Sequence, residues 1–245
     1  MTQFISRIHQ DLREARAIRR GSTHTPDNVL RGLHKEYPRM PKIALPAPAP
    51  LAMRLDEALI KRASFTRAHS ARPFTTSELG TLLGHALGMR TKIARKYPSG
   101  GALYPVETYL IGKVLEDFSP GAFHYHPTAH ALEHLWDVAP DFKMTDLTRS
   151  PSTPLSQVLL VFTAVWARSS MKYGDWAYHL AMLEAGHMAQ NILLTATATQ
   201  TQARPVGGFD DSINELLDLD LREQAIYSIL LSPGMHTSSA DEIYE

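Results

Sequence analysis

Residues 97–114 read YPSGGALYPVETYLIGKV, and this stretch joins a glycine-rich loop to an apolar segment. Gly100 and Gly101 can adopt positive φ angles and let the backbone approach a ligand closely, and Ser99 adds a hydroxyl beside them. The apolar part, residues 105–114, is typical of a buried strand. The loop lacks the Gly-Lys-Ser/Thr of a Walker loop and the GxGxxG of a dinucleotide fingerprint. It predicts either a ligand-contacting loop or a tight connection between two elements.

The pattern on either side of this loop predicts an α+β fold. Residues 176–200 form the longest helical pattern and are apolar nearly all round, which indicates a helix buried in the core or in a subunit interface. Residues 157–167 are β-branched, aromatic and apolar, as in a central strand. We therefore expect a mostly antiparallel central sheet flanked by helices. The other predicted strands span 122–126, 131–138 and 225–231, and the other predicted helices span 54–61, 213–219 and a segment from about Ser77, with a capping box between Thr75 and Glu78.

The chain is expected to hold one folded domain with an extension at each end. Its 245 residues suffice for one well-buried core, which we place in residues 51–234. Residues 1–50 begin as an amphipathic helix over 1–20 and end in the Pro-rich stretch PKIALPAPAP (41–50). Repeated proline cannot continue a helix, so we expect an extension that wraps the core or meets a partner. Residues 235–245 are expected to form a polar, flexible tail.

Composition argues against several classes of function. The formal net charge is zero, with 25 basic and 25 acidic residues, so no basic excess indicates a nucleic-acid or membrane-surface partner. The chain has no cysteine, which excludes disulfides, thiolate nucleophiles and cysteine-ligated metal sites and fits a cytoplasmic protein. No segment resembles a signal peptide, and none reaches the roughly 20 apolar residues of a membrane span.

Two further segments offer groups that could hold a cofactor. KRASFTR (61–67) places Arg62, Ser64 and Thr66 at the end of a predicted helix. Guanidinium and hydroxyl donors suit a phosphate or the polar edge of a flavin, although a solvated helix end is the alternative. PVGGFDD (205–211) turns at two adjacent glycines, whose backbone N–H groups could donate to a heteroaromatic ring. The alternative there is a plain turn with an aspartate that caps the next helix.

MKYGDW (171–176) places a lysine beside a tyrosine, between the predicted central strand and the long helix. A cation next to a phenol favours the phenolate, and a phenolate can act as a general base. Neighbours in a regular helix or strand face different directions. Lys172 and Tyr173 can therefore share a pocket only if the backbone is irregular there, which Gly174 permits. The alternative is a surface lysine beside a half-buried tyrosine.

The histidines of the predicted hairpin do not form a recognisable metal motif. His124 and His126 would share one strand face, with His130 and His134 nearby. Neutral imidazoles bind Zn²⁺, but the sequence has no HExxH and no strict ligand spacing, so no metal site is predicted. A serine hydrolase is also disfavoured, because there is no GxSxG elbow.

Four segments together resemble the SagB-type dehydrogenases of the nitroreductase superfamily, and they occur in that family's order. They are YPSGGALYPVETYL, GAFHYHPTAHALEHL, LEAGHMAQNILLTATA and PVGGFDD, within a resemblance that runs from about Leu55 to Leu231. The full YPSGGALYP string and the pair Lys172–Tyr173 resemble the FMN-dependent azoline oxidases of the microcin type, which build thiazoles and oxazoles in modified peptide antibiotics. The resemblance implies a nitroreductase-like fold, with the long helix at the interface of a homodimer.

The resemblance also implies an FMN site shared between two subunits. The first motif would hold the polar tail and ring edge of FMN, the loop that begins at Pro98 would reach it from the second subunit, and the 205–211 loop would lie near the reactive N5. The cofactor-binding residues implied in this way are Arg62, Ser64, Thr66, Pro98, Ser99, Gly100, Gly101, Val206, Gly207 and Gly208, and the catalytic pair is Lys172 and Tyr173. The family usually opens its first motif with Arg-Arg-Ser followed by a further Arg. Here Ala63 and Thr66 replace two of these arginines, and Arg67 is the expected substitute.

The implied function is oxidation of a peptide azoline, a thiazoline or oxazoline, to an azole during the biosynthesis of a ribosomally made modified peptide. Tyr173, assisted by Lys172, would remove or relay a ring proton, FMN would accept the hydride equivalent, and oxygen would reoxidise the flavin. The precursor peptide and the cyclodehydratase subunits that make the ring are the implied partners. Three alternatives stay open: an NAD(P)H-dependent nitroreductase-like enzyme, an oxidase of carrier-bound intermediates, and a flavin-free scaffold subunit.

Overall fold

The computed structural model describes residues 34–66, 72–139, 141–148, 150, 152–153 and 156–234, together with residues 7, 10, 11 and 14. The predicted helix over 1–20, apart from those four residues, lies outside the described residues, as do the predicted tail over 235–245 and Arg67. Within the described residues, no helix is both long enough and apolar enough to cross a membrane.

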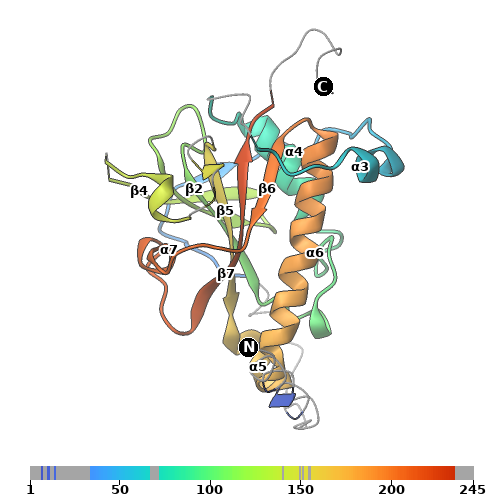
Figure 1. Cartoon of the computed structure of the whole chain (residues 1–245), viewed down its shortest axis with the longest axis vertical. Coiled ribbons are helices and arrows are strands. Elements are labelled where there is room, and N and C mark those ends of the chain that lie inside the picture. The colour runs from blue at the N-terminus through green and yellow to red at the C-terminus, as the bar shows by residue number, and fades with distance from the viewer. Residues whose placement is uncertain are drawn as a thin grey trace.

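One seven-stranded sheet forms the centre of the molecule, and all neighbouring strands are antiparallel (Figure 1). The strand order is β1-β4-β3-β2-β5-β7-β6, and every residue of the central strand β2 is buried. A strand covered on both faces reads as a nearly continuous apolar run, which is the pattern that predicted it. The strands are β1 (Lys42–Ala44), β2 (Val106–Gly112), β3 (Gly121–His126), β4 (Ala131–Asp137), β5 (Val158–Val165), β6 (Gln202–Val206) and β7 (Glu223–Ser232).

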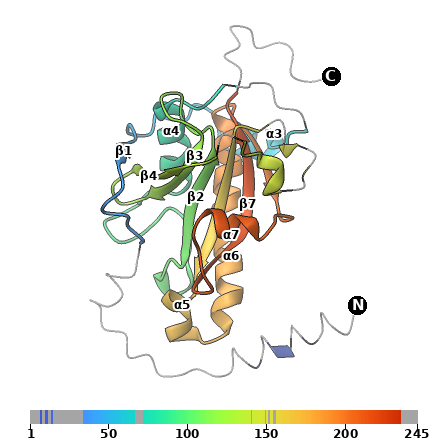
Figure 2. The ribbon, with the colours of Figure 1, turned by 90° about the vertical axis from the view of Figure 1, so that its left-hand side faces the viewer.

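Helices α4 (Thr76–Ala86) and α6 (Trp176–Ala198) pack against one face of the sheet (Figure 2). The side chain of Thr75 accepts a hydrogen bond from the backbone N–H of Glu78, and the Glu78 carboxylate accepts one from the backbone N–H of Thr75, so the predicted capping box of α4 is confirmed. The helices are α3 (Leu55–Lys61), α4 (Thr76–Ala86), α5 (Trp166–Tyr173), α6 (Trp176–Ala198) and α7 (Ser212–Leu216), with short 3₁₀ turns η1 (Gly100–Ala102) and η2 (Met144–Asp146).

The segment that precedes α3 covers part of the opposite face of the sheet. The backbone N–H of Lys35 donates to Glu107 Oε1 at 2.8 Å, and its ammonium group donates to Glu223 Oε2 at 2.7 Å. The Tyr37 hydroxyl lies 3.0 Å from that of Tyr109. Burial of a carboxylate is costly unless it is paired, so this segment neutralises charges that the sheet alone would leave buried.

The predicted α+β fold with a mostly antiparallel sheet flanked by helices is confirmed. One predicted boundary is wrong, because the apolar run over 157–167 ends as a strand at Val165 and Trp166 begins α5. The edge strands β1 and β6 were not predicted. Both are short, and Pro205 lies in β6; proline is tolerated only at sheet edges and lowers the strand signal there.

Candidate active site

The glycine-rich loop folds into a tight turn with an unusual backbone. Gly101 has a φ of 66°, and Ala102 and Tyr104 have φ angles of 54° and 46°. These values lie in the left-handed region, which residues other than glycine occupy at a cost. The turn is held by Ser99, whose Oγ accepts a hydrogen bond from the Tyr104 backbone N–H at 2.9 Å. The Arg168 guanidinium also stabilises the turn, because it donates a hydrogen bond to the Tyr104 carbonyl at 2.9 Å.

Lys172 and Tyr173 both reach this turn. A Cβ atom placed on Gly101 would lie 2.5 Å from the Tyr173 hydroxyl oxygen and 2.9 Å from the Lys172 nitrogen. The same nitrogen lies 5.3 Å from the centroid of the Tyr173 ring. The two side chains can converge because α5 ends at Tyr173, and Gly174 follows with a φ of 56°. The structure thus brings together the Gly-Gly turn and the lysine–tyrosine pair, which sequence analysis singled out separately.

Replacing Gly101 with alanine tests this close approach. The added Cβ would collide with the tips of both side chains, and displacement of catalytic groups by about 1 Å can lower a rate by about 10²-fold. We expect Gly101→Ala to fold and to lose about that much turnover. Gly186→Ala is the matched control, because its Cβ would meet no atom within 4 Å. Equal activity in the two variants, measured at saturating substrate, would contradict the role of the turn.

Buried charges support the turn from beneath. Glu107 on β2 pairs with Arg168 on α5, and its Oε2 lies 3.2 Å from His124 Nε2. Burial alone would raise the pKa of Glu107, but Arg168 and His124 hold it well below its usual range. Neither Glu107 nor Arg168 was predicted as a site residue. A charged residue inside the apolar run VETYLIG was the signal that could have indicated a buried ion pair.

Glu184 on α6 is a second buried carboxyl under the loop, and it too was missed. It is 1% exposed, its Oε1 accepts a hydrogen bond from the Val106 N–H at 3.3 Å, and its Oε2 has no partner among the described residues. Burial raises the pKa of Glu184 to about 7, against the opposing effects of Ser99, Arg95 and Arg168. This carboxyl therefore titrates near neutral pH.

The titration of Glu184 predicts a pH dependence of stability. The unfolded chain releases this proton near the ordinary value of 4.5, and the folded chain releases it only near 7. The free energy of unfolding is therefore highest below pH 4.5 and falls by about 3 kcal/mol at most as pH rises to about 7. Glu184→Gln removes this loss, so its urea midpoint should exceed that of the parent protein at pH 8 and match it more closely at pH 5. Parallel pH profiles for the two proteins would contradict the assignment.

The other predicted cofactor residues form a separate group at the β6 edge. Arg62 is half-buried at the end of α3, and Ser64 and Thr66 are exposed. The Arg204 guanidinium donates to the Phe65 carbonyl at 3.0 Å and so ties this segment to β6. Arg204 was not predicted as a site residue; it lies just before the Gly-Gly loop and adds a cation beside the first motif, in which Ala63 and Thr66 replace expected arginines.

The second Gly-Gly loop follows β6 and presents open backbone. Val206 is buried, and its carbonyl accepts a hydrogen bond from Ser228 Oγ at 2.8 Å. Gly207 and Gly208 are exposed, and a Cβ on either would meet no atom within 4 Å. The Gly208 carbonyl accepts a hydrogen bond from Thr148 Oγ1 at 3.0 Å. Since no close contact within the described chain excludes a side chain at these two positions, the space they leave open can accept a ligand.

The sequence itself matches a known family over this whole region. A profile of the Nitroreductase family matches residues 60–232. The chain belongs to the nitroreductase family. The nitroreductase candidate MJ1384 of Methanocaldococcus jannaschii is 31% identical over 185 residues, which cover 74% of this chain and 90% of that protein. The microcin B17-processing protein McbC of Escherichia coli is 31% identical over 140 residues, which cover 54% of this chain and only 52% of McbC.

Solved structures agree with the family. A chain of the E. coli microcin synthetase McbBCD complex with truncated pro-MccB17 superposes with a TM-score of 0.62 at 20% identity, covering 96% of this chain and 93% of that one. A candidate nitroreductase from Desulfovibrio desulfuricans in complex with FMN has a TM-score of 0.51 at 17% identity, covering 77% of this chain and 91% of that one. At these identities the likeness shows the nitroreductase fold.

The residues of this nitroreductase-family chain fit an FMN. The backbone of Gly207 and Gly208 is open, since an added Cβ would meet no atom within 4 Å, and such backbone allows the close approach of a planar ring. Arg62 and Ser64 precede Phe65, whose carbonyl accepts the Arg204 hydrogen bond, so guanidinium and hydroxyl groups of the kind that bind phosphate occur in this segment. Beside Phe209 lies a groove of about 320 Å³ with the stacked rings of Trp166 and Tyr178 on its wall.

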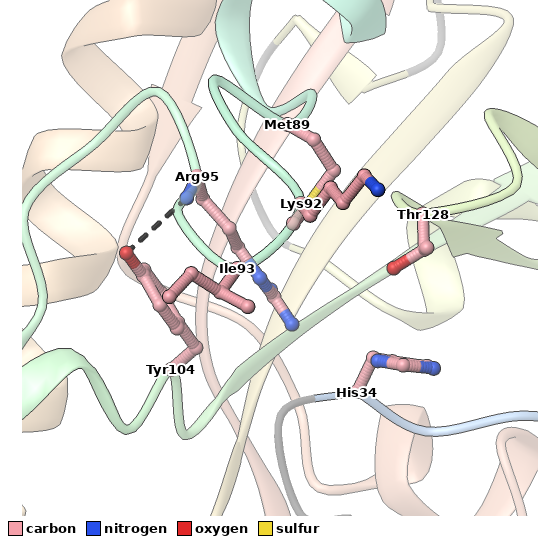
Figure 3. Close-up of a pocket in the computed structure, with 7 residues that line it drawn as sticks. All are labelled: His34, Met89, Lys92, Ile93, Arg95, Tyr104 and Thr128. Atoms are coloured by element: carbon pink, nitrogen blue, oxygen red, sulfur yellow. Dashed lines mark hydrogen bonds between the residues drawn. The ribbon is translucent and has the colours of Figure 1, made fainter. Parts of the chain in front are cut away.

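A second cavity is too small for a flavin. It lies beside the glycine-rich loop, where the Arg95 guanidinium points toward His34 and the Tyr104 hydroxyl accepts a hydrogen bond from the Arg95 backbone N–H at 3.2 Å (Figure 3). Its volume of about 90 Å³ has room for about three water molecules. The cavity is therefore too small for the ring system of a flavin.

One side-chain group has the composition of a metal site. Ligand atoms of His34, Glu36 and His126 lie within 4.8 Å of one another. However, His126 Nδ1 accepts a hydrogen bond from the Ala129 N–H at 3.1 Å. Neutral His126 then carries its proton on Nε2, the atom 3.8 Å from Glu36, and a protonated nitrogen cannot ligate a metal. The arrangement favours a polar cluster, and the absence of a metal site stays a prediction.

Proposed function

We propose that this protein is an FMN-dependent dehydrogenase that oxidises azoline rings of a ribosomally made peptide to azoles. One observation carries the proposal: the Tyr173 hydroxyl and the Lys172 ammonium converge on the Gly101 turn. A base is needed there because an azoline must lose a proton as well as a hydride to become aromatic. The E. coli relative named for microcin B17 processing supports this substrate class.

The chain's own residues divide the work between them. Arg62, Ser64 and Arg204 would hold the FMN phosphate, and the backbone of Gly207 and Gly208 would face its ring. Bound FMN supplies a two-electron acceptor, which oxygen returns to its oxidised form. Tyr173 takes the ring proton, and the Lys172 ammonium stabilises the negative charge on the phenol oxygen before that transfer. Tyr173 would hold one of the two ring hydrogens as a proton, and FMN held by these residues would supply the acceptor for the other hydrogen and its electron pair.

The partners follow from the same reasoning. An azoline is formed by cyclodehydration of a peptide, so the substrate must come from a cyclodehydratase. The solved microcin synthetase complex, which contains a chain of this fold with a bound pro-peptide, supports a comparable assembly here. We propose that a homodimer of this chain works with cyclodehydratase subunits and their precursor peptide.

The visible absorption spectrum of the purified protein tests the cofactor. A yellow protein that releases one FMN per chain on heating is expected. An azoline-containing peptide should then lose two hydrogens per ring, by mass spectrometry, without NAD(P)H. NAD(P)H consumption with no change in the peptide would favour the reductase alternative. A colourless protein that also fails to bind added FMN would refute the oxidoreductase proposal and favour the scaffold.

A further inference from the structure

We propose that Lys35 is a positioning residue for the reaction: through Glu107 and Glu223 it fixes helix α5, which carries the lysine–tyrosine pair. The inference rests on the proposed function, because it takes that pair as catalytic. It goes further in assigning a role to a residue that precedes the part of the chain matched by the nitroreductase family, residues 60–232. Lys35 lies in the segment over residues 34–44, here called the strap.

One carboxylate oxygen joins the strap to α5. The backbone N–H of Lys35 donates to Glu107 Oε1 at 2.8 Å, and the Arg168 guanidinium on α5 pairs with the same oxygen. Glu107 is 1% exposed, and hydrogen bonds to a charge are strong where water is excluded. Arg168 also donates to the Tyr104 carbonyl at 2.9 Å. A path from the strap to the glycine-rich turn therefore runs through two side chains.

The ammonium group of Lys35 holds the junction from which α5 starts. It donates to Glu223 Oε2 at 2.7 Å, and Glu223 is paired in the sheet with Val165, the last residue of β5. Trp166 follows as the first residue of α5, and its backbone N–H donates to the carbonyl of Arg222 at 3.1 Å. Lys35 thus contacts α5 through Glu107 and the strands at its start through Glu223.

The strap supplies a charge that this junction needs. Glu223 is 7% exposed, and a buried carboxylate is costly unless it is paired. Burial alone would lower the pKa of Lys35, but Glu223 raises it above its ordinary value, so the ammonium stays charged. Without that charge the carboxylate keeps the neutral hydroxyls of Tyr109 and Thr163 as donors. A buried charge left in this state draws in water or shifts, and the start of α5 shifts with it.

Hydrogen exchange of the full-length protein tests the assignment without a substrate. Lys35→Met keeps the backbone N–H and the length of the side chain and removes the ammonium. We expect the amides of α5 to exchange about tenfold faster in this variant, because local opening is easier where contacts are lost, while the amides of α4 keep the parent rate. Lys35→Arg keeps the positive charge and should return α5 toward the parent rate.

Lys42→Met is the matched control. Lys42 is also a strap lysine, and its Nζ lies 3.3 Å from Oε1 of the buried Glu133. Glu133 lies on β4 and reaches Glu107 through a further side chain, His124. Loss of a strap ion pair alone would affect both variants equally. We expect kcat per bound FMN to fall about tenfold in Lys35→Met and to stay near the parent value in Lys42→Met, because small displacements of catalytic groups slow the chemical step.

The outcomes separate this inference from the proposed function. Equal α5 exchange in the parent and Lys35→Met would overturn it, as would faster exchange in all helices alike, which indicates lost global stability. Faster α5 exchange at an unchanged kcat would also overturn it. Faster α5 exchange in a protein that forms no azole would keep the role of Lys35 toward α5 and refute the substrate. If Lys35→Met does not fold, the double variant Lys35→Met, Glu223→Gln removes both charges, and the same α5 exchange decides.

Discussion

Tyr173→Phe is expected to keep FMN and to lose azoline oxidation by about 10²–10⁴-fold, the usual contribution of a positioned general base. The substitution removes the hydroxyl that lies nearest to the Gly101 turn and keeps the ring. Its effect should appear in kcat at saturating substrate, because the proton is transferred in the chemical step. The measurement is the rate of azole formation per bound FMN.

The controls for this variant separate chemistry from packing. Tyr227→Phe removes a half-buried hydroxyl on β7, outside the candidate site, and should leave the rate unchanged. Lys172→Met should lose activity more than Lys172→Arg, since arginine keeps a positive charge beside the phenol. Full activity of Tyr173→Phe with normal FMN content would remove Tyr173 as the base.

The sequence predicted the central elements of the fold because their patterns are local. The buried strands β2 and β5 read as apolar runs, and the capping box of α4 lies within four residues. The long helix α6 was predicted by length and periodicity. Helix α5 was missed because it follows β5 without a break, and Trp166 continues the apolar pattern of the strand. No turn residue marks this boundary.

The sequence was less informative about the site, because its parts meet only through long-range contacts. The two glycine pairs and the lysine–tyrosine pair stood out as motifs, yet nothing in the sequence indicated that Gly101 touches Lys172 and Tyr173. The supporting charges Glu107 and Arg168 are separated by 61 positions and have no motif of their own. Likewise, the buried contacts of Lys35 could not be inferred from a Pro-rich extension, and the family match begins only at residue 60.

Arg168→Ala is expected to destabilise the fold by about 3–5 kcal/mol, the range for a buried ion pair that loses one partner. Glu107 is 1% exposed and the Arg168 side chain 10% exposed, so water cannot replace the missing charge. Arg168 lies four residues before Lys172 on α5, and its guanidinium also donates to the Tyr104 carbonyl. Surviving folded protein should therefore also show a lower rate per FMN. The measurement is the urea unfolding midpoint at pH 7.

The destabilisation by Arg168→Ala is expected to depend on pH because it leaves the Glu107 carboxylate unpaired. In the parent protein Arg168 and His124 hold the pKa of Glu107 well below its usual range, against burial. Its contribution is present above the unfolded pKa of about 4.5 and lost as pH falls. Without Arg168 the buried carboxylate is penalised most at neutral pH, so the gap between variant and parent should shrink in acid. The exposed pair Arg222–Asp220 is the matched control, and Arg222→Ala should leave the midpoint nearly unchanged.

A second substitution separates loss of charge from loss of packing. Glu107→Gln removes the charge that Arg168 neutralises, so the double variant Arg168→Ala, Glu107→Gln should be less destabilised than the sum of the two single changes. A purely additive result would mean that Arg168 acts through its contacts with the Tyr104 carbonyl and the surrounding side chains. In that case the glycine-rich loop, and with it the position of the lysine–tyrosine pair, would depend on packing of α5 more than on the buried ion pair.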